Sequence, residues 1–405
     1  MKGIKIKVLK LEDSKQYKKR FIDKQLVIIL LILMCISIVA IYLATPVMPY
    51  YMQSENYYIK QIFWYIISFS SLFIILNLGV DRLFTGVKVL YWILLILLII
   101  LMIDKYIINI PDILIKPING TTAWISIPKV GSIQPSEFMK VVLVIRSGLI
   151  IYKHKINNLE NTYTNDIKLF TNILKICIIP VILILLQPDT GLPLIMFISI
   201  AIMLYISGIK KGWIIASITL FITIFFGIIF IYEYFPDFFY DISGGYRLNR
   251  IYGWLDSEKY HLSYGNQLYT SLLSLGSSGI SGHDLNKAII SIAEPQTDFI
   301  FTIIGQNFGF VGTTFTLLII TIFDLKLISI AKASEYNAEK LMLAGIIGML
   351  LFQQVQNIGM VIGLLPITGI TLPFISYGGS SMLSYFIPLA IAFHLSSETK
   401  AKFIH

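Results

Sequence analysis

Charged residues are scarce in this sequence of 405 residues, where Asp, Glu, Lys and Arg together make up 14%. A soluble domain carries roughly 25% charged residues, so this chain has too little charge to cover the surface of a soluble protein of its size. Cysteine is scarcer still, with two in all. Cys35 and Cys177 both fall inside apolar segments, where we expect small core residues rather than a disulfide or a metal pair.

Apolar residues are abundant instead, at 56% of the chain, and the mean hydropathy is +0.77. They are concentrated in blocks separated by short polar stretches, and a helix needs roughly 20 consecutive apolar residues to span a membrane. The sequence therefore predicts an all-α integral membrane protein with about ten transmembrane helices. The expected helices lie near 26–44, 58–78, 86–103, 136–152, 170–186, 192–207, 213–232, 299–322, 341–362 and 379–394.

Basic residues predict how these helices are oriented. The formal net charge of +9 could suggest nucleic-acid binding, but Lys and Arg cluster at segment ends rather than on a polar domain. Because basic loops tend to stay in the cytoplasm, both termini are predicted to be cytoplasmic, with no nucleic-acid partner. The predicted cytoplasmic loops and tail carry Arg82, Lys88, Lys153, Lys155, Lys168, Lys210, Lys211, Lys326, Lys332, Lys340, Lys400 and Lys402.

The predicted organisation is one membrane domain with two short tails. Residues 1–25 form a basic cytoplasmic tail with no evident signal-peptide cleavage site. Residues 26–396 form a single polytopic domain, and 397–405 form the second cytoplasmic tail.

Three polar segments are predicted on the outer face, at 104–135, 235–297 and 364–377. The second is a large extracellular loop between the seventh and eighth helices, and a loop of that length usually has its own structure and a role. Within it, Arg247 and Arg250 share a helical face, and leucines repeat at helical spacing from Leu268. This pattern fits either helices lying on the outer leaflet or a lid packed on the protein.

Two polar motifs begin predicted helices at the outer face. The motif QPSEFMK, from Gln134, puts Glu137 in a first helical turn and Lys140 at the start of a long apolar run. The two could simply form an ion pair at i, i+3, or Lys140 could line a wet pocket that holds an anionic pyrophosphate. In QPDTG, from Gln187, Asp189 could cap the next helix or face a substrate cavity.

Two further motifs occur later in the chain. In TDFIF, Thr297 could cap a helix with Asp298 as a favourable first-turn acid, kept ionised by the helix dipole until substrate buries it. The stretch LPITGITLPFISYGGSS, from Leu365, predicts irregular backbone that must be buried in protein or line water. Before it, Gln353, Gln356 and Asn357 form a polar stripe that fits interhelical hydrogen bonding, or the same cavity.

In this order, these four motifs closely resemble the SEDS family (shape, elongation, division and sporulation), which includes RodA and FtsW. The resemblance runs from the first helix to the last, and the QP of QPDTG leans toward the RodA branch. It implies ten transmembrane helices in the bacterial cytoplasmic membrane. It also implies a peptidoglycan glycosyltransferase that polymerises lipid II beside a class B penicillin-binding transpeptidase, with membrane lipids around it.

The resemblance also implies roles for single residues. Asp298 matches the family's essential aspartate, and Trp124, in NGTTAWI, matches its essential tryptophan. Glu137, Lys140 and Asp189 match polar residues of the family's central cavity. The sequence departs from the family pattern at Ala123, often basic, at Gln296, commonly histidine, and at Gln306 and Asn307, usually an acidic pair.

We therefore predict Asp298 as the base that deprotonates the attacking sugar hydroxyl. Lys140 would offset charge on the leaving pyrophosphate, helped by Arg247 or Arg250; a divalent cation could share that work. The rival classes are a lipid-precursor transporter and a non-catalytic scaffold, and a transporter would place its polar residues at the membrane midplane. The predicted substrate-binding residues are Trp124, Glu137, Lys140, Asp189, Arg247, Arg250, Thr297 and Ser376.

Overall fold

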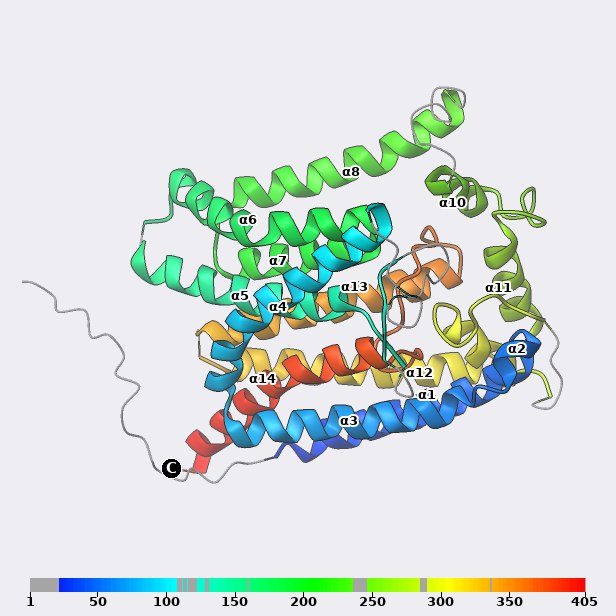
Figure 1. The fold of residues 1–405 in the computed structure, drawn as a ribbon, viewed down its shortest axis with the longest axis horizontal. Coiled ribbons are helices and arrows are strands. Elements are labelled where there is room, and N and C mark those ends of the chain that lie inside the picture. The colour runs from blue at the N-terminus through cyan, green and yellow to red at the C-terminus, as the bar shows by residue number, and fades with distance from the viewer. Residues whose placement is uncertain are drawn as a thin grey trace, which may run out of the picture.

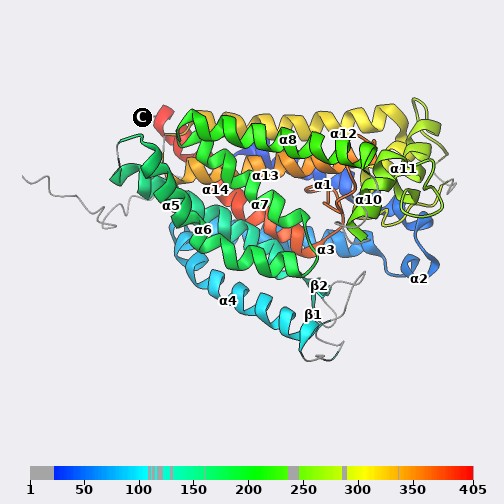
Figure 2. The ribbon, with the colours of Figure 1, turned by 90° about the horizontal axis from the view of Figure 1, so that it is seen from above.

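The computed structural model describes residues 22–107, 111, 115, 122–127, 131–158, 160–235, 246–284, 290–335 and 337–404. Each of the ten predicted segments is helical, and the helices run roughly side by side (Figures 1 and 2). Their bounds are α1 (Lys24–Ala44), α3 (Tyr57–Leu78), α4 (Val80–Tyr106), α5 (Pro135–Asn157), α6 (Tyr163–Leu186), α7 (Gly191–Ile206), α8 (Lys211–Tyr234), α12 (Ile300–Ala333), α13 (Ala338–Val361) and α14 (Gly379–Ile404).

Shorter elements connect these helices. The predicted outer segments contain α10 (Tyr246–Leu255) and α11 (Asn266–Ser277), together with an unpredicted hairpin of β1 (Ile125–Ile127) and β2 (Gly131–Ile133). The two strands are antiparallel, with Ile125 opposite Ile133. A turn of 3-10 helix (Thr45–Val47) and the four-residue α2 (Tyr50–Gln53) follow α1.

The protein is a multi-pass membrane protein. Within the described residues, eight helices are long and apolar enough to cross a membrane, while α7 is apolar but shorter. Large side chains such as Ile215, Phe221 and Phe226 of α8 lie exposed on the outside of the bundle. Lipid tails are as apolar as these side chains, so their exposure is favourable only in a membrane. The number of spans, ten, stays a prediction.

The most buried helices are α13 and α14, which lie in the middle of the bundle. Helix α3 packs along α14, α7 along α13, and α1 along α12. Small residues permit close helix contact inside a membrane. At Gly345, for example, the backbone oxygen accepts a hydrogen bond from Ser199 Oγ of α7 at 2.7 Å.

Helix α12 is longer than the predicted 299–322, because its polar residues are partnered. Asp324 is buried and accepts a hydrogen bond from Gln354 Nε2 of α13 at 3.2 Å. Lys326 forms an ion pair with Asp23, at the N-terminus of α1, at 3.0 Å. The helix also kinks at Gly309, whose φ of +59° favours glycine.

Helix α11 of the long loop packs on the bundle, as the lid alternative predicted. Its Ser271 Oγ donates to the backbone oxygen of Val361 at 2.9 Å and lies 2.7 Å from Thr302 Oγ1. Leu268 is buried, and Trp254 Nε1 of α10 donates to the backbone oxygen of Gly363 at 3.0 Å. The loop therefore covers the start of α12 and the end of α13.

The two ends of the bundle differ. The turns after α5, α7 and α12 lie at the same end as the C-terminus, and α2, α10 and α11 lie at the opposite end (Figure 1). The first end carries Lys155, Lys210 and Lys340, as predicted for one face of a membrane. Helix α14 extends the chain at this end through Ile404, and the predicted tail 1–25 lies almost wholly outside the described residues.

Candidate functional site

A cavity of about 1240 Å³ opens among the elements at the end that carries α2, α10 and α11. Its walls come from α3, the β-hairpin, the start of α5, the α6–α7 junction, α10, residues 294–298 and residues 368–379. Most of the predicted site residues meet here although they are far apart in sequence. Those that line the cavity are Trp124, Glu137, Asp189, Arg250, Thr297 and Asp298.

The segment 362–378, between α13 and α14, forms one side of this cavity. Most of it has no regular hydrogen-bonding partners of its own, so its carbonyl groups need donors from elsewhere. Side chains of α1, α3, α10 and α13 supply them. The donors are Ser37 to Ile375 (2.7 Å), Gln61 to Ser376 (3.2 Å), Tyr65 to Phe374, Gln356 to Pro366 (2.9 Å), Asn357 to Ile370 (2.8 Å) and Trp254 to Gly363 (3.0 Å).

The same segment is tied to the backbone around Asp298. Ser376 Oγ donates to the backbone oxygen of Thr297 at 2.6 Å and accepts from the backbone N–H of Leu372 at 2.8 Å. Asn357 Nδ2 donates to the backbone oxygen of Asp298 at 2.8 Å. The polar stripe on α13 therefore forms hydrogen bonds, of which the one from Asn357 fixes the peptide that carries Asp298. Gln353 of the same stripe also lines the cavity, so both alternatives hold.

Asp298 lies just before α12 rather than in its first turn. The helix begins at Ile300, its N-cap is Phe299, and no side chain caps it. The Thr297 hydroxyl donates instead to the backbone oxygen of Glu294 at 3.3 Å, so the capping alternative for Thr297 and Asp298 is wrong. Gly369 lies against this carboxyl, since a Cβ there would contact Asp298 Oδ2 at 3.4 Å, and its φ of +73° favours glycine.

Burial and two neighbouring charges set the proton affinity of Asp298. Its pKa is raised to about 7, first by burial and then by the carboxyl of Glu294, while the guanidinium of Arg250 opposes both. The carboxyl is already partly buried by protein in the absence of substrate, so its pKa is raised where the sequence predicted that the helix dipole would keep it low. Glu294 has a φ of +51°, a left-handed conformation that costs energy for a residue with a side chain.

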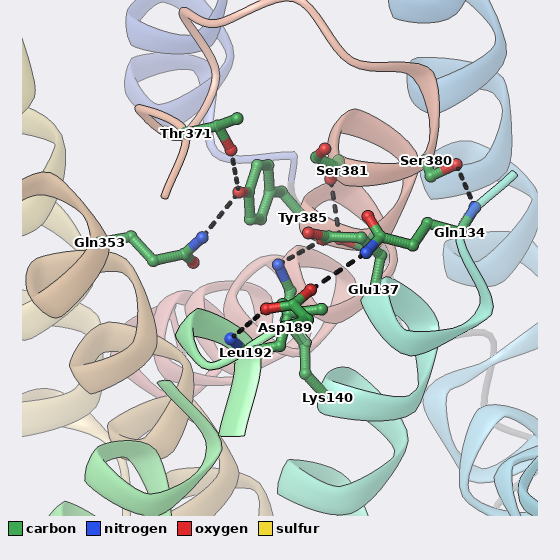
Figure 3. Close-up of polar contacts among 11 residues, drawn as sticks. Gln134, Glu137, Lys140, Asp189, Leu192, Gln353, Thr371, Ser380, Ser381 and Tyr385 are labelled. Atoms are coloured by element: carbon green, nitrogen blue, oxygen red, sulfur yellow. Dashed lines mark hydrogen bonds and ion pairs between the residues drawn. The ribbon is translucent and has the colours of Figure 1, made fainter. Parts of the chain in front are cut away.

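Glu137 and Lys140 form the predicted ion pair, one turn into α5 (Figure 3). Lys140 Nζ lies 2.5 Å from Glu137 Oε2 and 4.5 Å from the ring centroid of Tyr385 on α14. Ser384 Oγ donates to the same Glu137 oxygen at 3.2 Å. Lys140 is 0% exposed and does not line the cavity, whereas Glu137 does. Lys140 therefore has no direct contact with the cavity, and its partner Glu137 lies between the two.

Asp189 fills both predicted roles at once. Its Oδ1 accepts from the backbone N–H of Leu192 at 3.2 Å, in the first turn of α7, and its Oδ2 accepts from Gln134 Nε2 at 3.2 Å (Figure 3). Burial raises the pKa of Asp189. One oxygen thus caps a helix, and the other links α5 to α7 at the cavity wall.

Three predicted substrate-binding residues remain, Arg250, Arg247 and Ser376. Arg250 Nη1 donates to the backbone oxygen of Ile367 at 3.4 Å. The side chain of Arg247 lies outside the described part of the structure. Ser376 does not line the cavity, and both hydrogen bonds of its hydroxyl go to backbone groups. Ser376 therefore stabilises the backbone of the site, whereas the sequence predicted that it would contact substrate.

Several residues at this site were not predicted from the sequence. Among them, Gln61 and Tyr65 of α3 hold the 362–378 segment, and Tyr385 of α14 accepts a hydrogen bond from Gln353 Nε2 at 2.8 Å (Figure 3). Gln61 could have been found, since an amide in an apolar helix usually faces a polar partner. The tyrosines carry no such signal, because aromatic residues are ordinary in membrane helices.

The predicted divalent cation has no matching set of ligands. Over the described residues, no three side chains of His, Cys, Asp or Glu gather where they could share a metal ion. Glu137 and Asp189 already accept hydrogen bonds from protein donors.

These features define a class: a multi-pass membrane protein whose polar, acid-lined cavity opens at one end of its helix bundle. The chain belongs to the cell cycle protein family that includes FtsW, RodA and SpoVE, whose family model matches residues 23–401. The predicted membership of the SEDS family is thereby confirmed, and the protein is a multi-pass protein of the bacterial cytoplasmic membrane.

Individual relatives match over almost the whole chain. Stage V sporulation protein E of Bacillus subtilis is 30% identical over 95% of this chain and 99% of its own length. The probable peptidoglycan glycosyltransferase FtsW of Wigglesworthia glossinidia brevipalpis is 32% identical over 94% of both chains.

Solved structures share the fold. A chain of a peptidoglycan synthase complex that coordinates polymerization and crosslinking matches 93% of this chain and 98% of its own length, with a TM-score of 0.71 and 22% identity. The rod shape determining protein RodA of Thermus thermophilus matches 93% of this chain and 97% of its own length, with a TM-score of 0.62 and 22% identity. The named relatives thus include a sporulation protein, a probable peptidoglycan glycosyltransferase and a rod shape determining protein, and the lean to the RodA branch stays a prediction.

Proposed function

We propose that this protein is a peptidoglycan glycosyltransferase that polymerises lipid II at the outer face of the cytoplasmic membrane. The observation that carries the proposal is the setting of Asp298. Its carboxyl lines the cavity on a peptide fixed by Asn357, with a pKa near neutrality set by burial, Glu294 and Arg250. A relative named probable peptidoglycan glycosyltransferase supports it, at 32% identity over nearly the whole chain.

The reaction joins two lipid-linked sugars. The 4-hydroxyl oxygen of the acceptor attacks the anomeric carbon of the donor and forms the new glycosidic bond. The bond from that carbon to the pyrophosphate oxygen breaks, and lipid pyrophosphate leaves with the bonding electrons. Asp298, in its ionised form, takes the hydroxyl proton. A pKa near 7 suits a general base, because the group is partly ionised at neutral pH and still basic enough to accept a proton.

Other residues would position the reactants. Arg250 is a described cation whose charge acts on Asp298 and lowers its pKa. We therefore propose that Arg250 stabilises the negative charge that develops on the leaving pyrophosphate. Lys140, buried behind Glu137, orients that carboxylate in the wall instead of touching the leaving group. Trp124 and Asp189, which also line the cavity, are assigned to the sugar rings.

The proposal includes an orientation and a partner. The basic end of the bundle faces the cytoplasm, with both termini, and the cavity end faces outward. Residues 235–297 then form the large extracellular loop of the single membrane domain 26–396. A class B penicillin-binding transpeptidase would crosslink the strands, and a complex that couples polymerization to crosslinking is the setting of one structural neighbour.

The rival classes differ in where they need polar groups. A transporter that flips the lipid precursor would need them near the membrane midplane, whereas Asp189, Glu294 and Asp298 lie at helix ends or in connecting segments. A scaffold would have no need of an acid whose pKa is raised toward neutrality by its surroundings. Both arguments favour an enzyme.

The direct test is strand synthesis by the purified full chain supplied with fluorescent lipid II in detergent or liposomes. We expect a ladder of glycan strands on a gel, and an inactive Asp298→Asn preparation excludes contaminating polymerases as its source. Transfer of intact lipid II across liposomes without any polymer would identify a transporter. Neither polymer nor transfer, with the cognate transpeptidase present, would identify a scaffold.

A further inference from the structure

The charge of the cavity lining sets a requirement for its substrates. Among the described residues, the lining contains four acids, Glu137, Asp189, Glu294 and Asp298. Two lipid-linked sugars bring two pyrophosphates, which these acids repel. Each pyrophosphate must therefore be bound by a positively charged group.

Two basic side chains line the cavity in the described part of the chain, Arg250 and Lys60. They come from different elements, α10 and α3, which lie on different sides of the bundle (Figures 1 and 2). Arg250 donates to the backbone oxygen of Ile367, near the start of the 362–378 segment. Lys60 lies over the ring of Tyr57 at 5.4 Å, and Tyr57 packs edge-on against Tyr377, near the segment's end, at 4.8 Å.

The chemistry of the reaction distinguishes the two positions. The donor's pyrophosphate is attached to the anomeric carbon under attack, so it must lie beside the base. Arg250 meets this condition, because its guanidinium donates to the backbone oxygen of Ile367, two residues before Gly369, which lies against the carboxyl of Asp298. Lys60 lies instead beside Tyr57, which packs on Tyr377. The acceptor's pyrophosphate is two sugar rings away from the attacking hydroxyl and must lie across the cavity from the base.

We propose that Lys60 binds the pyrophosphate of the acceptor lipid, which makes α3 the wall of the acceptor site. The assignment rests on the proposed glycosyltransferase function and adds to it a second anion site, separate from the one at Arg250. The side chain is suited to capture, since 45% of it is exposed and its ion-pair partner, Glu55, is equally accessible. A pyrophosphate can displace an exposed carboxylate at little cost, because surface ion pairs are weak.

A binding experiment tests this site without relying on turnover. Trp64 and Trp124 both line the cavity, so tryptophan fluorescence reports its occupancy while purified full-length protein is titrated with undecaprenyl pyrophosphate in detergent. We expect two equivalents to bind the wild type. In Lys60→Met the affinity of one of the two sites should fall roughly five- to tenfold, and Lys60→Arg should restore it. Two unchanged affinities in Lys60→Met would overturn the proposal.

A matched control is available at the same end of the bundle. Lys105 of α4 also lies over a tyrosine ring, that of Tyr106 at 5.1 Å, but it does not line the cavity. Lys105→Met should bind two equivalents with wild-type affinities. If it too lost affinity at one site, a general loss of surface charge would explain the result and the Lys60 site would be rejected.

Polymerisation separates this proposal from the one on which it rests. With lipid II as substrate, Lys60→Met should raise KM roughly five- to tenfold and change kcat by less than about twofold, since one charged contact is lost in ground and transition states alike. A lowered kcat at unchanged KM would reject an acceptor-binding role. A wild type that binds two equivalents but makes no strands would uphold the two anion sites and reject the glycosyltransferase.

Discussion

The hydroxyl of Ser376 donates a hydrogen bond to the backbone oxygen of Thr297 at 2.6 Å and thereby joins two segments that lie far apart in the sequence. The same oxygen atom of Ser376 accepts from the backbone N–H of Leu372. Asp298 is the next residue after Thr297, so this bond and the one from Asn357 hold the peptide of the proposed base from both sides.

Ser376→Ala should therefore weaken both the fold and the reaction. The hydroxyl hydrogen-bonds to two backbone groups, and its loss should lower the free energy of unfolding by about 1–3 kcal/mol. A looser Asp298 should lower kcat, with KM for lipid II little changed. Thermal unfolding of the purified protein and initial rates of strand synthesis measure the two effects. A raised KM at unchanged melting temperature would instead support the substrate contact predicted from the sequence.

Asp298→Asn should leave a folded but inactive protein. No side-chain cap depends on Asp298, and the amide has nearly the same shape as the carboxylic acid. Removal of a general base typically lowers a rate by roughly 10²- to 10⁴-fold. The measurement is strand synthesis at matched yield and thermal stability. Polymerisation near the wild-type rate by such a variant would move the chemistry to another residue.

Glu294→Gln should shift the pH dependence of the reaction. The base works when ionised, so the rate should rise through pH about 7 in the wild type, the pKa of Asp298. The Glu294 carboxylate raises that pKa, and its removal should move the rising limb of kcat/KM to lower pH. Arg250→Met should move it to higher pH, because a charge that lowers the pKa is lost. Unmoved profiles in both variants would show that another group limits the rate.

Lys140→Met should destabilise the protein as well as inactivate it, because it leaves the Glu137 carboxylate without its buried cation. Breaking a buried ion pair from one side costs about 3–5 kcal/mol. The double variant Glu137→Gln with Lys140→Met removes both charges and should recover most of the melting temperature. If it also recovered polymerisation, the pair would be purely structural and Lys140 a buried anchor for its helix.

The membrane orientation can be tested by cysteine labelling in a chain whose Cys35 and Cys177 are replaced by alanine. A probe that cannot cross the membrane should label a cysteine at Ser257 in intact spheroplasts. A cysteine at Asn158, in the turn after α5, should react only after the membrane is opened. The opposite pattern would invert the topology and put the cavity on the cytoplasmic side.

The helices follow from the amino-acid sequence alone, because runs of apolar residues long enough to cross a membrane have few other structures available to them. All ten predicted segments are helical, and the motifs around Glu137, Asp189 and Asp298 lie at the same cavity. These motifs were visible because polar groups are costly at membrane depth and so stand out against their surroundings.

Which of these groups are in contact depends on how the helices pack. The burial of Lys140 behind Glu137, the tie of Ser376 to Thr297 and the place of Asp298 before its helix all depend on contacts between segments far apart in the chain. The same holds for Lys60 and Gln61, one beside the cavity and the other inside the bundle, although they are neighbours in one helix. Helical periodicity gives the direction of a side chain from its own helix axis, and the packing of the other helices decides what it meets there.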